Sequence, residues 1–174
     1  ALLRRVIRLA LRRSDAVIAV SEFTAKDVIR FGGVMEAHVD TIPEGGPPPS
    51  RRSEGAPQDF FLFVGKLERT KGITDLIGAF RQSSVLADAG YRLVIVGPDG
   101  NASEDVAMAM RGCEDRVSRP GFVTESDLQA LYRTCRGFVF PSIAEGFGLV
   151  VLEAMAQGAP VIAARATSLP EVIG

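Results

Sequence analysis

Hydrophobic residues in the N-terminal part of the chain switch between helical and extended spacing. A helical spacing, with arginines between the apolar positions, predicts an amphipathic helix with a basic face over residues 2–13. Residues 13–20 are predicted to form a turn and a strand. Ser21 caps a predicted helix over 22–31, and residues 39–42 form a short strand. A basic helix can also lie on a membrane surface, but the strand that follows it at once favours a helix within a domain.

Glycine and proline interrupt this pattern in residues 45–57, which contain three Gly and four Pro. Such a stretch continues neither a helix nor a sheet ladder, so a linker is predicted there. The chain then divides into two parts. Residues 1–44 are expected to form one αβαβ piece, and residues 58–174 a second domain.

The second domain alternates short apolar runs with amphipathic segments. Strands are predicted over residues 60–64, 92–96, 117–119, 137–140 and 160–163. Helices are predicted over residues 71–81, 103–111, 124–136 and 147–157. This alternation is typical of a parallel sheet covered by helices on both faces. The predicted fold class is therefore α/β, a Rossmann-like parallel sheet preceded by a partial αβαβ piece.

Composition and charge narrow the classes of function. The 174 residues are 47% hydrophobic and 24% charged, with a net charge of −1, so no overall basic field recruits nucleic acid or anionic lipid. With two cysteines and the single histidine His38, the chain lacks the side chains of a zinc site, and the cysteines are expected to pack. His38 is expected to be structural or exposed. No G-x-G-x-x-G or P-loop motif occurs, which argues against dinucleotide oxidoreductases and P-loop enzymes.

The ends of the chain suggest a longer protein. The sequence begins without Met and stops in mid-pattern at Gly174, so we expect an excerpt whose second domain is truncated at its C-terminus. No apolar run approaches the ~20 residues that span a membrane. The cysteine usage fits the cytoplasm as the expected location, with peripheral contact at the inner membrane face, through the N-terminal domain of the full-length protein, as an open alternative.

Ligands of an open parallel sheet bind outside the carboxyl ends of its strands. Gly65 and Lys66 follow the predicted strand 60–64, and Lys71 stands at the start of the next helix. Two cations at one strand-to-helix junction suit a diphosphate. Pattern alone leaves ordinary surface lysines as an equal alternative.

The densest candidate chemistry follows the predicted strand 137–140. Gly146 and Gly148 flank the start of a helix, where unpaired amides and the positive end of the helix dipole bind anions. Glu153 carries the only charge between residues 149 and 156, so it needs hydrogen-bond donors, either ligand hydroxyls or an unseen arginine.

A second carboxylate precedes the same helix. Glu145 gains helix-dipole energy at this position even without a ligand. Glu153 lies eight positions further on, a rise of about 12 Å in a helix, so the two carboxylates can address two polyol groups on either side of a bound phosphate. This arrangement describes a nucleotide sugar.

Two segments also resemble a known family. Residues 63–72, Phe-Val-Gly-Lys-Leu-Glu-Arg-Thr-Lys-Gly, look like its V-G-[RK]-L-x-x-x-K-G motif, and residues 142–161 look like its signature of two glutamates separated by seven residues. Residues 14–21 and 169–173 are weaker similarities. On these motifs the sequence resembles the retaining nucleotide-sugar glycosyltransferases of family 4, the group 1 glycosyl transferases, which have the GT-B fold.

The resemblance implies roles for the residues that match its motifs. Lys66 and Lys71 would bind the donor diphosphate beside Gly65, and Glu145 would hold hydroxyls of the donor sugar. Glu153 would bind the ribose. The family more often has arginine in place of Lys66, so a bidentate contact becomes a point charge here.

Backbone groups would complete the donor site. The amides that the resemblance assigns to the diphosphate are those of Phe147, Gly148 and Leu149. The backbone of Val123 would contact the base. Because basic side chains and helix amides can neutralise a leaving diphosphate, no metal and no other cofactor is expected.

The implied reaction is transfer of a hexosyl group, with retention, from a UDP-, GDP- or ADP-sugar to a glycan, lipid-linked or small-molecule acceptor. No nucleic-acid partner is expected. The resemblance implies that residues 1–44 are the C-terminal part of the N-terminal, acceptor domain. The excerpt alone is expected to be inactive, because acceptor and catalytic elements of the family lie largely in that domain. The alternatives are a non-catalytic nucleotide-binding module and a GT-B-fold epimerase or phosphorylase.

Overall fold

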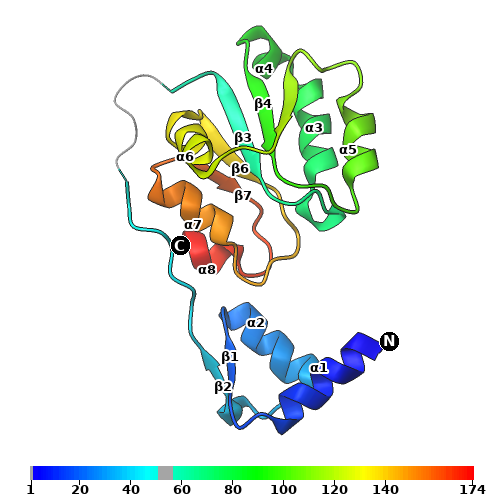
Figure 1. Cartoon of the computed structure of the whole chain (residues 1–174), viewed down its shortest axis with the longest axis vertical. Coiled ribbons are helices and arrows are strands. Elements are labelled where there is room, and N and C mark those ends of the chain that lie inside the picture. Colours follow the sequence, from blue (N-terminus) through cyan, green and yellow to red (C-terminus); the bar gives the residue numbers. More distant parts are fainter. Residues whose placement is uncertain (1, 51–56) are drawn as a thin grey trace.

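The structure, a computed structural model, describes residues 2–50 and 57–174 and contains two separate parallel sheets (Figure 1). The N-terminal sheet pairs β1 (Val17–Ala19) with β2 (Val39–Thr41). Helix α1 (Leu2–Arg13) precedes β1, and α2 (Glu22–Asp27) follows it. This is the αβαβ order predicted from the sequence.

The second helix of this segment differs from the prediction in its last turns. α2 runs directly into a π-helix (Val28–Gly32), and a 3₁₀ turn (Glu36–His38) precedes β2. The last carbonyls of a helix have no partner within it, and Arg8 Nε donates to one of them, Phe31 O, at 2.9 Å. Ser21 is the N-cap, as predicted, because its side chain accepts from the Thr24 amide.

The larger sheet has five parallel strands in the order β5-β4-β3-β6-β7. They are β3 (Phe60–Val64), β4 (Arg92–Val96), β5 (Val117–Gly121), β6 (Gly137–Phe140) and β7 (Val161–Ala163). The connecting helices are α3 (Ile73–Gln82), α4 (Ser84–Asp88), α5 (Ser103–Met110), α6 (Glu125–Thr134), α7 (Leu149–Ala156) and α8 (Leu169–Ile173). The predicted α/β class with a parallel sheet is confirmed.

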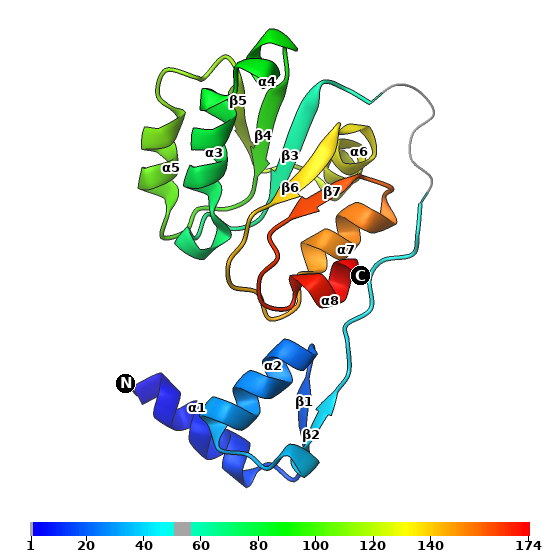
Figure 2. The ribbon, with the colours of Figure 1, turned by 180° about the vertical axis from the view of Figure 1, so that it is seen from behind.

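The helices form two layers on this sheet. Figures 1 and 2 show α3 and α5 side by side against one face and α6 and α7 against the other. Right-handed crossovers produce this division, because the chain moves one way across the sheet from β3 to β5 and the opposite way from β5 to β7. Strand β3 lies at the centre of the sheet, and helices cover both faces of the sheet. This burial on both faces explains why β3 is apolar throughout.

Two helix starts differ from the predicted ones. α3 begins at Ile73 rather than at 71, because a 3₁₀ turn (Arg69–Lys71) and a left-handed Gly72, with φ 66°, precede it. α7 begins at Leu149 rather than at 147, with Gly148 as its N-cap. The short helices α4 and α8 were not predicted, although Ser83 caps α4 through its side chain.

The predicted linker lies partly outside the described residues. Residues 45–50 contain neither helix nor strand, and residues 51–56 are not described. The Ser50 amide donates to Ala156 O at 2.6 Å, at the end of α7. The predicted domain boundaries stay predictions.

The core of the described chain lies between the larger sheet and its helices. Its largest fully buried side chains include Tyr132, Phe63, Phe138 and Phe140. Cys113 and Cys135 are buried in the same core, in line with the packing role expected for them. His38 is exposed, also as expected.

Candidate functional site

The order of the strands defines a switch point between β3 and β6. From β3 the chain proceeds to β4 and β5 on one side, and then returns to β6 and β7 on the other. Loops leave the carboxyl ends of these two central strands in opposite directions, which opens a crevice for ligands. Gly65 follows β3 and Pro141 follows β6, so the crevice lies between the two predicted motifs.

The loops after β3 and β6 are in contact at this point. A Cβ on Gly72 would lie 2.6 Å from the carbonyl oxygen of Pro141, so only glycine allows this approach. Thr70 O accepts hydrogen bonds from the Ile143 amide at 2.9 Å and from Ser142 Oγ at 3.2 Å. These contacts hold residues of the two motifs together, although they are some seventy positions apart in sequence.

Two of the predicted site residues form an ion pair. Lys71 Nζ lies 2.5 Å from Glu145 Oε1, and the two side chains are only 18% and 12% exposed. The ammonium also lies 5.3 Å from the centre of the Phe140 ring. Residues predicted for different parts of one ligand therefore contact each other directly.

Lys66 is less enclosed than Lys71. Its ammonium lies 3.1 Å from Glu68 Oε1, and its side chain is half-exposed. Gly65, immediately before it, donates its amide to Val96 O at 2.9 Å. A Cβ on Gly97, which follows β4, would lie 2.0 Å from Gly65 O. The backbones after β3 and β4 therefore lie so close together that only glycine fits at position 97.

The loop that leads into α7 is held mainly through its carbonyl groups. Ser168 Oγ lies 3.0 Å from Glu145 O and 2.9 Å from Phe147 O. The Glu145 amide donates to Thr167 Oγ1 at 3.0 Å. The first amides of a helix have no partner within the helix, so this end of α7 presents the positive end of the helix dipole.

Glu153 is bound by a residue that the sequence analysis missed. Tyr132, on α6, donates its hydroxyl to Glu153 Oε2 at 3.2 Å. The donor that the protein itself supplies is thus a tyrosine hydroxyl rather than the arginine considered from the sequence, and the contact of Glu153 with ligand hydroxyls stays a prediction. Figure 1 shows α6 and α7 on one face of the sheet, and their register there brings these two side chains together.

Burial perturbs both members of this pair. Desolvation raises the pKa of the Glu153 carboxyl above its ordinary value, and the hydrogen bond from Tyr132 opposes that rise. Burial and the adjacent carboxylate raise the pKa of the Tyr132 hydroxyl. The hydroxyl therefore stays protonated and remains a donor across the physiological range.

Val123 lies apart from the other predicted residues. It follows β5, the edge strand, which is separated from β3 by β4. Its side chain is partly buried against the core, whereas the neighbouring Phe122 is 93% exposed. Its contact with a base stays a prediction.

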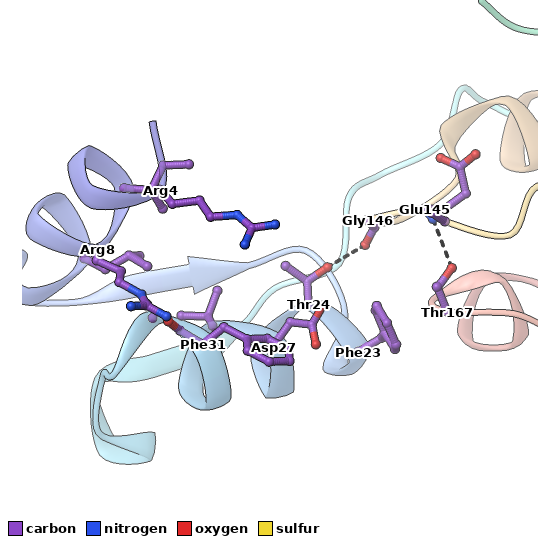
Figure 3. A pocket seen from close by; sticks show the side chains of 14 residues that line it. Arg4, Arg8, Phe23, Thr24, Asp27, Phe31, Glu145, Gly146 and Thr167 are labelled. Atoms are coloured by element: carbon purple, nitrogen blue, oxygen red, sulfur yellow. Dashed lines mark hydrogen bonds between the residues drawn. The ribbon is translucent and has the colours of Figure 1, made fainter. Parts of the chain in front are cut away.

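A cavity of about 760 Å³ lies between the N-terminal segment and residues 144–146. Figure 3 shows Arg4 and Arg8 of α1 and Phe31 after α2 on one wall, with Gly146 and Thr167 on the opposite one. The Glu145 carboxylate points away from α1 in this view. No motif in the sequence indicated this cavity.

Two further searches were made over the part of the chain that the structure describes. Within it, no three His, Cys, Asp or Glu side chains are grouped as a metal ion would require. Nor does any described helix combine the length and apolar character needed to cross a membrane.

The fold and the two motifs at the switch point define the class of protein. The family model of the glycosyl transferases group 1 matches residues 49–174, so the chain belongs to that family. O-antigen chain mannosyltransferase B of Escherichia coli is 32% identical over 180 residues, which cover 95% of this chain and 47% of that protein. The MMP alpha-(1→4)-mannosyltransferase of Mycolicibacterium hassiacum is 28% identical, over 94% of this chain and 40% of that protein.

Solved structures agree with this assignment. Anabaena HepE in complex with UDP and glucose superimposes with a TM-score of 0.81 at 26% identity, over 99% of this chain and 50% of that one. TarM of S. aureus has the same TM-score at 20% identity, which supports the GT-B fold alone. The chain spans about half or less of the length of these relatives.

Proposed function

We propose that this chain carries the donor-binding domain of a glycosyltransferase that transfers a hexosyl group from a nucleoside-diphosphate sugar. The observation that carries the proposal is the convergence of four features at one switch point: Gly65, Lys71, Glu145 and the start of α7. A cation, a carboxylate and unpaired helix amides are the groups that a sugar diphosphate requires. The family assignment supports the same class of reaction.

The ligand would lie across the crevice in a defined order. The diphosphate would contact Lys71 and the amides of residues 147–149, with Lys66 as a more exposed second cation. Glu145 would then exchange its contact with Lys71 for hydroxyls of the donor sugar. The ribose would bind Glu153, whose other side is held by Tyr132.

Electrostatic stabilisation of the leaving diphosphate would be the main contribution of this domain to catalysis. Charge grows on the diphosphate as the glycosidic bond breaks, and groups already fixed in place stabilise it without reorganisation. We propose that transfer proceeds with retention and without a bound metal. UDP, GDP and ADP remain the candidate leaving groups, and UDP has precedent in the HepE complex.

The acceptor and the location complete the proposal. A glycan, a lipid-linked or a small-molecule acceptor would approach from the N-terminal side of the crevice. A cytoplasmic location is proposed, with peripheral contact at the inner membrane face as the alternative, because α1 exposes Arg4, Arg5 and Arg8 together with Leu2 and Leu3. Co-sedimentation with anionic vesicles distinguishes these two locations.

Calorimetric titration tests the donor site directly. The chain is titrated with UDP, GDP and ADP, each with and without EDTA, and then with the corresponding nucleotide sugars. We expect one of the three nucleotides to bind equally well in both buffers. Absence of binding for all three would overturn the proposed donor site, and binding that EDTA abolishes would overturn its metal independence.

A further inference from the structure

Hydroxyl groups hold the carbonyls of three successive residues just before α7. Ser168 lies within hydrogen-bond distance of Glu145 O and Phe147 O, at 3.0 and 2.9 Å. The carbonyl between them, Gly146 O, receives two hydroxyls, Ser21 Oγ at 2.7 Å and Thr24 Oγ1 at 2.9 Å. Figure 3 shows the bond between Thr24 and Gly146. A stretch of loop backbone is thus fixed from its carbonyl side.

The hydroxyls on Gly146 come from the N-terminal segment. Ser21 and Thr24 are 125 and 122 positions away from Gly146 in sequence. The Ser21 hydroxyl is also fixed from behind, because its oxygen accepts the Thr24 amide at 3.0 Å. Ser21 is 1% exposed, so water does not replace this contact.

A second contact fixes α2 against the larger domain. The Glu171 carboxylate, on α8, accepts the amides of Glu22 at 2.7 Å and Phe23 at 2.8 Å. Two charge-assisted hydrogen bonds to one carboxylate constrain both the position and the direction of α2. Ser21 and Thr24 are therefore presented to Gly146 O in a fixed orientation.

Planarity of the peptide bond carries this constraint to the other side of the loop. Gly146 C=O and Phe147 N–H belong to one rigid trans unit and point in opposite directions. Two donors on the carbonyl thus aim the amide, and they also polarise it, since hydrogen bonds on one end of a peptide strengthen those on the other. The Phe147 amide is one of the groups assigned above to the diphosphate.

We propose that Ser21 and Thr24 are positioning residues for the donor site. They set the orientation of the peptide unit between Gly146 and Phe147 from the N-terminal segment, and Glu171 holds α2 in place for this purpose. Donor affinity in the larger domain then depends on where the N-terminal segment lies. Because linkage is reciprocal, a bound donor in turn stabilises the contact between the two parts. The predicted effect on donor affinity rests on the proposed function, whereas the predicted effect on the orientation of the peptide unit does not.

Thr24→Val in the full chain is the main test. Valine keeps the shape of threonine and removes its hydroxyl, and Thr24 is not the cap of α2, so helix capping by Ser21 is retained. Thr24→Ser restores the hydroxyl. The matched control is Thr134→Val, because Thr134 Oγ1 also donates to a backbone carbonyl, Ala130 O at 2.8 Å, but within its own helix.

Two readouts are taken from each variant: the amide ¹⁵N and ¹H shifts of Phe147 by NMR, and the affinity for UDP, GDP and ADP by calorimetry. We expect Thr24→Val to move the Phe147 signal and to weaken the nucleotide that binds by about three- to tenfold, the usual effect of one lost hydrogen bond. Thr24→Ser and Thr134→Val should leave both readouts near the wild-type values. Ser21→Ala should add to the effect.

The outcomes separate the two proposals. A Phe147 signal that stays in place in Thr24→Val overturns the inference, even if nucleotide binds. Equal weakening by Thr134→Val also overturns it, because the loss would then reflect general destabilisation. If no nucleotide binds to the wild-type chain but the Phe147 signal moves, the positioning contact stands and the proposed function fails. Glu171→Gln, which weakens the hold on α2 without touching Gly146, provides a second folded variant with the same expected direction.

Discussion

The pair of Lys71 and Glu145 offers the sharpest test of how the crevice is divided between the parts of a donor. Lys71→Met removes the ammonium, and with it the cation that lies 5.3 Å from the centre of the Phe140 ring, but keeps an unbranched apolar side chain of similar length. Glu145→Gln removes the charge while keeping an oxygen that accepts from Lys71. The double variant completes a thermodynamic cycle for the pair.

The structure sets the size of the effects. At 2.5 Å and an effective dielectric of about 20, the gross attraction is roughly 7 kcal/mol. Desolvation offsets much of it, because both side chains are more than four-fifths buried. A net coupling of about 1.5–3 kcal/mol remains, which is typical of a hydrogen bond to a charged group. Lys71→Met should therefore lower the free energy of unfolding by at least about that amount, because it also leaves the buried Glu145 carboxylate without its cation.

Nucleotide binding should respond differently to the two substitutions. The diphosphate competes with Glu145 for the Lys71 ammonium, so Lys71→Met is expected to weaken UDP by about tenfold or more. Glu145→Gln removes the competing carboxylate and a negative charge beside the phosphates. It should leave UDP affinity unchanged or increase it, and should weaken only the nucleotide sugar.

Urea denaturation and calorimetry of the four proteins, with UDP and with UDP-sugars, measure both effects. With saturating UDP, the coupling energy between the two side chains should shrink, because the diphosphate takes the place of the carboxylate. If Glu145→Gln weakens UDP as strongly as Lys71→Met, the carboxylate supports the nucleotide itself and the division of the crevice is wrong.

Three further predictions concern the surroundings of the crevice. Tyr132→Phe keeps the ring packed on Phe138, at 5.5 Å between centroids, but removes the hydroxyl that donates to Glu153. UDP affinity measured by calorimetry should fall about three- to tenfold. Unchanged affinity would argue against Glu153 as part of the ribose site. The raised pKa of Glu153 means that the native state binds this proton more tightly than the unfolded state does. The residue therefore lowers stability as pH rises above about 4.5, the ordinary value for the carboxyl. The Tm of Glu153→Gln should increase relative to the wild-type Tm from about pH 4 to about pH 8, and a Tm difference that stays constant over this range would refute the argument. Gly72→Ala places a methyl group against Pro141 O at positive φ and should cost at least about 1–3 kcal/mol in urea denaturation, whereas Gly78→Ala, in open space within α3, should be neutral or stabilising.

The larger sheet was predictable because its signals are local. Most of its strands are short apolar runs bounded by turns, so the predicted strand 60–64 coincides with β3 and 137–140 with β6. The edge strand β5, Val-Ser-Arg-Pro-Gly, is the exception, and it extends two residues beyond the predicted 117–119. Helix starts were predicted less well, because a left-handed glycine at 72 or 148 moves the boundary by two residues without changing the hydrophobic pattern.

Contacts between residues far apart in the chain could not be predicted from the sequence. Spacing identified Lys71, Glu145 and Glu153 as individual candidates, but their partners depend on how loops and helices from distant positions meet. Tyr132 reaches Glu153 only through the register of α6 on α7. Likewise, nothing local to Ser21 indicates a carbonyl 125 positions away.

The position of a bound nucleotide tests the central claim most directly. Crystals of this chain grown with UDP should show the diphosphate beside Lys71 and the amides of residues 147–149, with the ribose hydroxyls on Glu153. Should GDP or ADP prove to be the nucleotide that binds, it takes the place of UDP in the crystals. A nucleotide bound elsewhere, such as in the cavity between α1 and residues 144–146, would contradict the donor site proposed at the switch point.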